Sequence, residues 1–561
     1  MTVAVFGTGV AGMTAAHELA ERGYEVSLYE RNAIVGGKSR SFGKPGTGTQ
    51  GRLDLPGEHG FRFFPGFYKH TPHTMSRIPV AGGNVAGRLV NVDLFSLMFN
   101  NNAPVTLPSN VGNIDTPHEF GVALAALTAF SGLGLDPLDS FFFAERMLCA
   151  AGASLVRRAS EYETADWETF IRVNQRGPAY KRVFSDGLAR PLVAMNPAET
   201  NSRTAVTIML QIFQNIVMPN QTADRILNDP TSIAWIEPWS KHLTSLGVAT
   251  HVNSNVVAIN LTGSSISSVT VHVDGTPVDV VADYYIFALP FEKLSSLLTP
   301  AIIAAAPELA NLAQLKNSWM TGLVFYFSGP NERDDGHVIF CDSPWALTSI
   351  WQLKYWQTVG TANIGNGKIT GVLSTIISNW DVHGSGNGKK AKDCTLAELI
   401  AEVQFQLNQH YAHAPGGPID FSRVVDVFLD PAISFNGGVV NGNDDPLLIN
   451  TVGSFQFRPA PMTAIANMLL AGDYVQTGTN LATMEGACEA GRLAANHVLL
   501  SEGHTGSFPV IFPLEEPDIF DAPKFVDLLR FNWGMPQFCL STAAQMASSA
   551  QKRGFPLSSP T

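Results

Sequence analysis

The chain has 561 residues and a formal net charge of −12 at pH 7. This acidic balance argues against nucleic-acid binding and against a broadly basic membrane-binding face. Charged residues make up 15% of the chain, against about 25% in a typical soluble protein, and hydrophobic residues make up 45%. We therefore expect about three or four domain-sized units that either bury a large core or present an apolar face.

The cysteine pattern and the first residues indicate in which cellular compartment the protein is expected. The five cysteines are scattered and never form a C-x-x-C pair, which is typical of a reduced, intracellular protein without a disulfide framework. The first apolar residues are interrupted by glycines and no basic residue precedes them, so no secretory signal is expected. We expect a cytoplasmic protein. Membrane association and oligomeric state are left open.

The longest notable uncharged run spans 120–135. It is shorter than the roughly 20 residues that a membrane-spanning helix needs. We expect a buried helix there, and the alternative is a membrane-dipping or substrate-portal helix.

The N-terminal segment has the order of a dinucleotide-binding unit. An apolar run at 3–6 suits a buried parallel strand, and good helix formers follow at 11–22, with Gly23 as a C-cap. Residues 24–30 then read as a second strand that ends in Glu30. A strand, a helix and a second strand ending in an acid are the parts of a Rossmann-like unit.

The turn after the first strand holds the glycine fingerprint G-x-G-x-x-G. Gly7 allows the tight turn, Gly9 lets the backbone approach a pyrophosphate, and Gly12 lets the helix pack on the strand. The helix N-terminus offers free N–H groups to the phosphates, and Glu30 can accept hydrogen bonds from ribose hydroxyls. The segment therefore predicts a dinucleotide site.

Two other stretches favour FAD over NAD. Just past Glu30, two glycines are followed by the cations Lys38 and Arg40, which suits a second approach to the pyrophosphate and flavin. Near the C-terminus, a buried strand at 468–471 ends at Asp473, and a helix begins at about residue 483. Asp473 can bond the ribityl or pyrophosphate region, and the helix N-terminus can face the flavin edge where negative charge gathers on reduction.

The segments between these motifs predict two insertions. Residues 76–234 look mostly helical, and α/β character returns at 233–259 with a helix at 239–245, followed by a hairpin that turns at residues 274 and 275. We expect an FAD-binding domain from 1–75, 235–295 and 455–500, a substrate domain from 76–234 and 296–454, and a tail at 501–561. Within the substrate domain we expect a strand at 322–329 and a helix at 395–410.

The motifs, in this order, resemble the flavin-containing amine oxidase and phytoene desaturase superfamily. Within it, "GEHGFRFFPGFY" (57–68) and "AGDYVQTGTNLATMEGACEAGR" most resemble hydroxysqualene dehydroxylases and carotene desaturases. The resemblance implies an α/β fold, a two-domain flavoprotein of the p-hydroxybenzoate hydroxylase and amine oxidase type. Its discontinuous Rossmann-like FAD-binding domain is accompanied by an α+β substrate domain. The family often has Arg where this chain has Lys38, which lacks the bidentate fork of Arg.

The FAD contacts predicted from the motifs and from the resemblance come from five parts of the sequence. They are Gly7, Gly9, Val10, Ala11, Gly12, Glu30, Arg31, Gly37, Lys38, Arg40, Gly57, Gly60, Val256, Gly472, Asp473, Thr483 and Met484.

The flavin would exchange a hydride at N5, and the protein would supply orientation and a dry, mainly aromatic pocket. Glu58 and His59 are candidate acid/base groups, and the alternative is that both only hold the loop in shape. Two H-x-x-H pairs lack the accompanying residues of a metal site, so none is expected. The pocket candidates are Phe61, Phe64, Trp345, Trp351 and Tyr474, with Phe63, Phe67, Tyr355 and Trp356 as further aromatics.

Three activities are compatible with this sequence. The first is FAD-dependent desaturation, dehydroxylation or saturation of carbon–carbon bonds in an apolar isoprenoid or polyene lipid. The second is a flavin amine oxidase, in which Tyr474 could belong to an aromatic cage. The third is a redox-neutral isomerase of polyunsaturated fatty acids, in which a basic residue such as Arg62 would bind the carboxylate.

Overall fold

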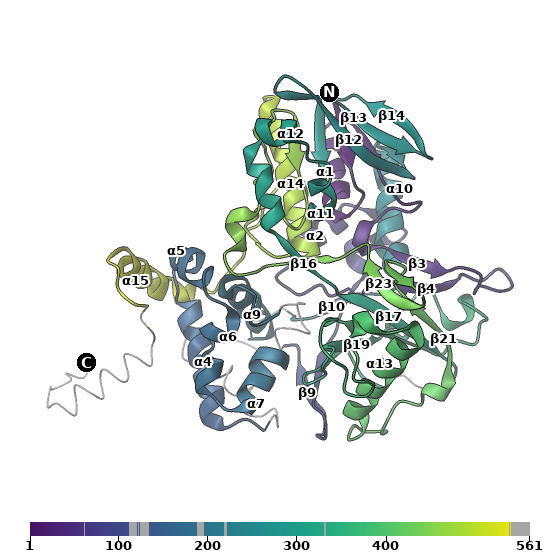
Figure 1. Ribbon diagram of the computed structural model, residues 1–561, viewed down its shortest axis with the longest axis vertical. Helices are drawn as coiled ribbons and strands as arrows, with labels where there is room; N and C mark the ends of the chain where they lie inside the picture. Colours follow the sequence, from purple (N-terminus) through teal and green to yellow (C-terminus); the bar gives the residue numbers. More distant parts are fainter. Residues whose placement is uncertain are drawn as a thin grey trace.

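The computed structural model describes residues 1–60, 62–110, 121, 123, 134–187, 196–217, 222–329, 333–537 and 539. Figure 1 shows three regions: a parallel-sheet region around the N-terminus, a second sheet region around β17 and β19, and a helical region around α4 and α9. The run at 120–135 and Phe61 fall largely or wholly outside the described residues, so the structure does not address the predictions made for them.

Five parallel strands form the sheet of the N-terminal region, in the order β11-β2-β1-β15-β25. The register pairs Val3 with Tyr284 and Phe287 with Leu470, so strands distant in sequence lie side by side. All five strands lie in the segments that the sequence assigned to the FAD-binding domain. Their bounds are Thr2–Phe6 (β1), Glu25–Tyr29 (β2), Ala249–His251 (β11), Tyr284–Phe287 (β15) and Met468–Leu470 (β25).

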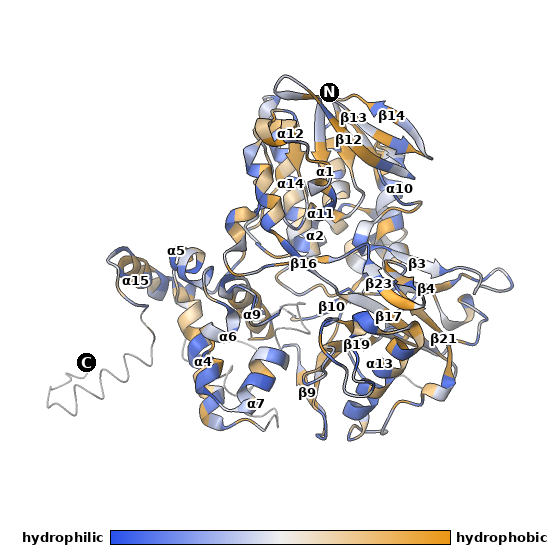
Figure 2. Ribbon diagram, viewed as in Figure 1, coloured by the Kyte–Doolittle hydropathy of each residue, from blue (hydrophilic) through white to orange (hydrophobic). Residues whose placement is uncertain are grey.

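Helices α1 (Val10–Ala20) and α14 (Met484–Ser501) pack closely together in this region. A Cβ atom at Gly491 of α14 would lie only 2.4 Å from the carbonyl oxygen of Ala11, so this contact requires a glycine. Figure 2 shows α14 with mainly hydrophobic colour where it lies in the interior. The predicted helix at 239–245 is α10 (Glu237–Ser245), and the hairpin turn at 274–275 joins β13 (Ser265–Val273) to β14 (Thr276–Val280).

A seven-stranded sheet, in the order β21-β17-β20-β19-β18-β8-β9, forms the second region. Helix α13 (Leu396–Tyr411) starts at a capping box formed by Thr395 and Glu398 and covers one face, whereas the hairpin β3–β4 (Ser41–Lys44 and Leu55–Glu58) lies on the other. The strands are Leu94–Met98 (β8), Val105–Pro108 (β9), Thr321–Phe327 (β17), His337–Phe340 (β18), Leu347–Trp351 (β19), Gly371–Ile377 (β20) and Val424–Leu429 (β21).

The third region is helical and includes the C-terminal segment. Helix α15 (Asp521–Asn532) lies on α5 (Leu155–Arg157), and Asp527 accepts hydrogen bonds from the Arg157 guanidinium, with the closest pair of atoms 2.8 Å apart. The part of the C-terminal segment from Glu516 to Asp527 is therefore packed onto the helical region, whereas Ser507, Val510 and Phe512 contact Arg22 after α1, helix α14 and helix α2 (His70–Ser76), respectively. The main helices of the helical region are α4 (Pro137–Ala151) and α9 (Ser202–Val217).

Two sequence predictions need correction. A disulfide joins Cys149 to Cys539, so the expectation of a chain without disulfides is wrong. The two cysteines are 390 residues apart, and spacing alone could not pair them. Residues 76–234 are also less helical than predicted, because short strands occupy 79–108.

The remaining helices are short, and the remaining strands belong to smaller sheets. They are α2 (His70–Ser76), α6 (Trp167–Phe170), α7 (Pro178–Tyr180), α11 (Phe291–Ser295), α12 (Pro300–Ala305), β5 (Pro79–Val80), β6 (Gly83–Asn84), β7 (Leu89–Asn91), β10 (Arg225–Leu227), β12 (Ser254–Thr262), β16 (Lys316–Ser318), β22 (Ile433–Asn436), β23 (Val439–Asn443) and β24 (Leu447–Ile449). Within the described part of the chain, no helix is both long enough and apolar enough to span a bilayer.

Candidate functional site

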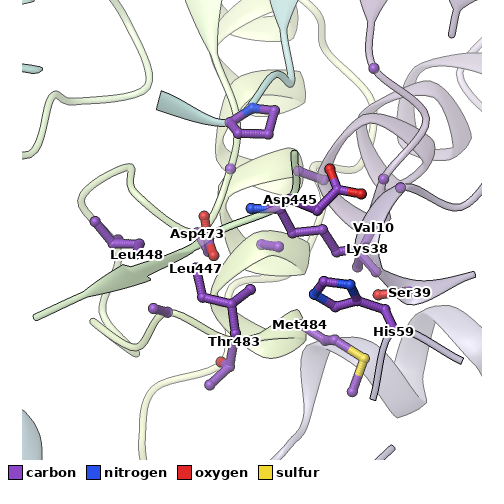
Figure 3. A pocket seen from close by; sticks show the side chains of 18 of the residues that line it. Val10, Lys38, Ser39, His59, Asp445, Leu447, Leu448, Asp473, Thr483 and Met484 are labelled. Carbon is purple, nitrogen blue, oxygen red and sulfur yellow. The ribbon is translucent and has the colours of Figure 1, made fainter. Parts of the chain in front are cut away.

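A single cavity of about 610 Å³ is lined from all three regions. Its size is within the range of small-molecule sites, which is roughly 300–1,000 Å³. In Figure 3, Lys38, Asp445 and His59 lie on one side of this cavity, and Leu447 and Leu448 lie on the other. Most of the predicted FAD contacts line it: Gly7, Gly9, Val10, Ala11, Glu30, Arg31, Gly37, Lys38, Arg40, Gly60, Val256, Gly472, Asp473, Thr483 and Met484.

The glycine fingerprint leaves backbone exposed to the cavity. Gly7 has φ +101°, and a Cβ there would lie 2.5 Å from the carbonyl oxygen of Ala288. Gly9 and Gly37 face each other, since a Cβ on Gly37 would lie 2.8 Å from the Gly9 Cα. Gly9 is also the N-cap of α1 and makes no side-chain cap, so the N–H groups of the first turn stay open. Such a cradle fits a pyrophosphate.

Glu30 holds together the two loops that end β1 and β2. Its carboxylate accepts hydrogen bonds from the backbone and hydroxyl of Thr8, at 3.1 and 2.6 Å, and from the backbone and side-chain amide of Asn32, at 2.9 and 2.8 Å. It is 4% exposed and lines the cavity beside Ser254 and Val256. This is the position that a ribose-binding acid requires in a dinucleotide fold.

Asp445 is a cavity residue that the sequence reasoning missed. Its carboxylate lies 2.9 Å from the Arg31 guanidinium and 3.3 Å from that of Arg40. Lys38 donates to the carbonyl oxygen of Pro446, and its Nζ lies 3.9 Å from Glu292. The cations predicted to meet phosphates are thus held at the wall by the loop before β24. That loop belongs to an insertion, where no motif marks it.

His59 presents one ring nitrogen to the cavity. Its Nδ1 bonds the Asp430 carboxylate, which also accepts the Ala432 N–H at 2.9 Å. Burial raises the pKa of Asp430, but the hydrogen bond and charge of His59 outweigh it, and the net pKa is lowered. When the His59 ring is neutral, the ionised Asp430 holds its proton on Nδ1 and Nε2 is then a hydrogen-bond acceptor. Nε2 is buried and has no partner among the described residues.

Glu58 does not line this cavity. Its carboxylate accepts hydrogen bonds from the backbone and hydroxyl of Thr231 at 2.8 and 2.9 Å, and burial raises its pKa. It borders a separate void of about 20 Å³ that Arg62 also lines. Arg62 reaches the main cavity as well and donates to the carbonyl oxygen of Lys38 at 2.8 Å. Glu58 is therefore placed to fix the loop and offset the Arg62 charge, and the expectation that it faces the flavin is not met.

The aromatic wall was only partly identified from sequence. Phe63 and Phe67 line the cavity, whereas Phe64 is fully buried against Trp235. Trp345 and Trp351 are fully buried on the α13 side of the seven-stranded sheet, because alternate side chains of a strand point to opposite faces. The other cavity side chains at this end are Tyr68, Thr200, Thr204, Ile208, Ile212, Met320, Thr348, Ile376, Leu447 and Leu448.

Three further predicted residues lie next to the cavity without lining it. Tyr474 is fully buried and packs on Phe291, which removes it as a cage residue. Gly57 is buried under Phe428, and a Cβ there would lie 2.5 Å from that ring. Gly12 permits helix packing, since its Cβ would lie 1.9 Å from the carbonyl oxygen of Gly7. The last finding agrees with the packing role predicted for Gly12.

A His17–Glu21–His242 cluster has the composition of a metal site. The Trp239 indole N–H donates to Nδ1 of His17 at 3.2 Å, so the ring proton is on Nε2, which donates to Glu21 at 3.0 Å. Glu21 is also paired with Arg77. A metal ion would have to displace the Nε2 proton, and in this structure the contacts of His17 tie α1 to α10.

The family model described as "Flavin containing amine oxidoreductase" matches residues 10–343 and 434–499 of this chain. The chain belongs to that family. This makes the protein an FAD-dependent oxidoreductase.

Several relatives and solved structures are similar over nearly the whole chain. A 15-cis-phytoene desaturase of Synechococcus elongatus is 23% identical over 508 residues, covering 89% of this chain and 96% of the relative. A probable zeta-carotene desaturase of the same organism is 24% identical, covering 89% and 98%. The solved structure of a putrescine oxidase bound to putrescine matches with a TM-score of 0.59 at 12% identity, covering 89% and 99%. The structural match shows a shared fold.

Proposed function

We propose that this enzyme acts on carbon–carbon bonds of an apolar isoprenoid or polyene lipid, in a reaction of the desaturase or dehydroxylase type. The observation that carries the proposal is the continuity of the cavity, which runs from the glycine cradle to a wall of aliphatic and aromatic side chains. The names of the desaturase relatives support the same substrate class.

The proposed FAD orientation assigns each part of the cofactor to cavity residues of matching chemistry. Glu30 and Val256 would bind the adenosine end, Gly9, Gly37 and Asp473 the pyrophosphate and ribityl region, and the N-terminus of α14 at Met484 the flavin. These contacts leave His59 and the apolar wall for the reacting end.

Bound FAD supplies hydride exchange at N5, and the protein supplies the surroundings. The side chains of α9 and the seven-stranded sheet exclude water and align an extended chain. His59 can accept a proton at Nε2, and Asp430 fixes the ring and stabilises the imidazolium that forms. In this proposal His59 is the catalytic acid/base group and Asp430 is a positioning residue.

The test is anaerobic mixing of the FAD-loaded protein with a panel of isoprenoid lipids and a panel of amines. The expected result is bleaching of the flavin absorbance by one or more lipids. Bleaching by an amine and by none of the lipids would contradict the proposal. A colourless protein that cannot be reconstituted with FAD would contradict every flavin-based reading.

Fatty-acid isomerisation is the second candidate, because Arg62 does line the cavity. Its guanidinium could pair with a carboxylate, although Glu58 and Asp430 already offset part of its charge. An isomerase would convert a polyunsaturated fatty acid without net bleaching or an added electron acceptor. Product analysis by chromatography under those conditions separates the two candidates.

Peripheral membrane contact remains a proposal for the helical region. Exposed apolar side chains on α4, α5 and α15 suit the interface from which an apolar substrate would enter. Sedimentation with neutral lipid vesicles tests it, and binding that persists after Phe525→Ser and Trp533→Ser would contradict it. The exposed residues are Leu138, Phe141, Leu155, Val156, Phe525, Val526, Leu529 and Trp533.

A further inference from the structure

We propose that the reacting end of the cavity carries a binding site for one hydroxyl group, formed by Nε2 of His59 and Oγ1 of Thr348. The lipid that it takes would then be an alcohol rather than a pure hydrocarbon. This inference rests on the proposed function, since it specifies the chemistry of the same apolar ligand.

The two groups lie over one row of the seven-stranded sheet. Asp430, just after β21, donates its N–H to the Gly322 carbonyl at 3.2 Å, Gly322 is paired with Ile376, and Ile376 is paired with Thr348. Paired residues of neighbouring strands point to the same face, and Thr348 and Ile376 both line the cavity.

His59 lies directly above this row. Its carbonyl oxygen accepts the Gly322 N–H at 2.7 Å, and a Cβ on the next residue, Gly60, would lie 2.9 Å from the Ile376 side chain. Because Asp430 binds Nδ1 at one end of the row, Nε2 is on the opposite side of the ring from Asp430. The floor of the cavity is thus apolar at Ile376 and polar at His59 and Thr348.

Both polar atoms are buried and have no hydrogen-bond partner among the residues that the structure describes. His59 is 7% exposed and Thr348 is 3% exposed. A buried polar group without a partner is unfavourable, so such a pair at a ligand site indicates a polar ligand atom. In the neutral His59 ring, whose Nδ1 proton is donated to Asp430, Nε2 is an acceptor, and the Thr348 hydroxyl can donate. An alcohol can donate to the first and accept from the second, whereas a hydrocarbon satisfies neither.

The charge of Arg62 does not change the assignment to a neutral hydroxyl group. Arg62 also lines the cavity, but the carboxylates of Glu58 and Asp430 act on its charge, and one of its nitrogens donates to Lys38. An anionic lipid would have to compete with both carboxylates. We therefore assign the site to a neutral hydroxyl group and treat carboxylate binding as an outcome of the test.

The experiment measures dissociation constants with the FAD-loaded protein under anaerobic conditions, from the ligand-induced change in flavin absorbance. The probes share one C20 isoprenoid chain: geranylgeraniol, geranyllinalool, the methyl ether of geranylgeraniol, the hydrocarbon without oxygen, and geranylgeranoic acid. We expect at least one alcohol to bind about tenfold or more tightly than the hydrocarbon and the ether, since a site built for a hydroxyl discriminates against its loss.

Variants separate the hydroxyl site from general packing. Thr348→Val removes the hydroxyl at nearly constant shape, and it should abolish the preference for the alcohol without lowering FAD content. His59→Phe should do the same. The matched control is Thr375→Val, because Thr375 is also fully buried with an unpartnered hydroxyl but points to the opposite face of the same sheet. Its preference should equal that of the wild type.

Each outcome decides the inference. Equal binding of hydrocarbon and alcohols, or an alcohol preference that survives Thr348→Val, overturns it while leaving the proposed function intact. A preference for the acid that Arg62→Gln removes also overturns it. Loss of FAD or a changed flavin spectrum in ligand-free His59→Phe, with Thr348→Val silent, would place His59 against the flavin instead. Failure of every lipid to bind or react would count against the proposed function itself.

Discussion

Replacement of Gly12 by alanine tests how closely α1 must approach the first strand. The new Cβ would lie 1.9 Å from the Gly7 carbonyl oxygen and 3.1 Å from the Ala288 Cβ. A carbon–oxygen contact needs about 3.2 Å, so α1 must retreat by about 1.3 Å. The first obstacle is backbone that cannot rotate away. We therefore expect a cost at the upper end of overpacking effects, about 3 kcal/mol.

The retreat would also weaken FAD binding. The N–H groups at the start of α1 would move beyond hydrogen-bond distance of a phosphate, because a nitrogen-to-oxygen distance of about 2.9 Å would increase to about 4 Å. At about 2–4 °C for each kcal/mol in a domain of roughly 200 residues, the unfolding midpoint should fall by about 6–12 °C. The assay is the FAD-to-protein ratio of the purified protein together with its thermal unfolding.

The matched control is Gly87→Ala, since a Cβ at Gly87 meets no atom within 4 Å. It should keep both the FAD ratio and the midpoint. If Gly12→Ala also retains one FAD per chain and unfolds within 1–2 °C of the wild type, the close-approach argument is wrong.

The other predictions concern FAD retention, the unfolding free energy at low pH and proteolysis of the C-terminal segment. Asp473→Ala should lose FAD, and full retention in the purified protein would refute its assigned role. Burial raises the pKa of Glu485, but the hydrogen bonds and charge of His70 and the backbone N–H groups outweigh burial, so the net pKa is lowered from 4.5. The ionised Glu485 therefore stabilises the folded state above about pH 4.5, and this stabilisation is lost as the pH falls further. Glu485→Gln should therefore flatten the decline of the unfolding free energy in acid, and an unchanged slope in denaturant titrations would contradict this. Arg157→Met removes the charged partner of the buried Asp527 and leaves it only the hydrogen bonds from Ser154, at a cost of up to about 3 kcal/mol, which should speed protease cleavage within 516–537. An unchanged digestion rate would show that other contacts hold the segment.

The residues predicted to bind the nucleotide could be identified from sequence, because they lie close together in one local strand–turn–helix–strand motif. Gly7, Gly9 and Glu30 act through a turn, a helix end and a strand end that follow one another directly, and the structure brings them to one cavity. Asp430 and Asp445 could not be found this way. Each follows a strand of an insertion, and its partner lies in the N-terminal segment, at a distance that no motif spans.

The residues predicted to line the substrate pocket were identified less accurately, because their position also depends on tertiary contacts. The density of aromatic residues at 345–356 indicated a wall, but Trp345 and Trp351 face α13, and the cavity face of the same strand carries Thr348. Which face of a sheet meets a ligand depends on the elements that cover each side, and one sequence does not reveal that choice. The disulfide between Cys149 and Cys539 was missed for the same lack of tertiary information.

The strand order of the parallel sheet also has a consequence for biosynthesis. The central strand β1 (Thr2–Phe6) leaves the ribosome long before its neighbour β15 (Tyr284–Phe287) and the edge strand β25 (Met468–Leu470). At about 5–20 residues per second, β1 would wait roughly half a minute to a minute and a half for β25. Until then, the apolar residues of β1 have no complete sheet to join. Nascent chains of this enzyme should therefore depend on chaperones that shield β1, and FAD cannot assist folding until β25 has been synthesised.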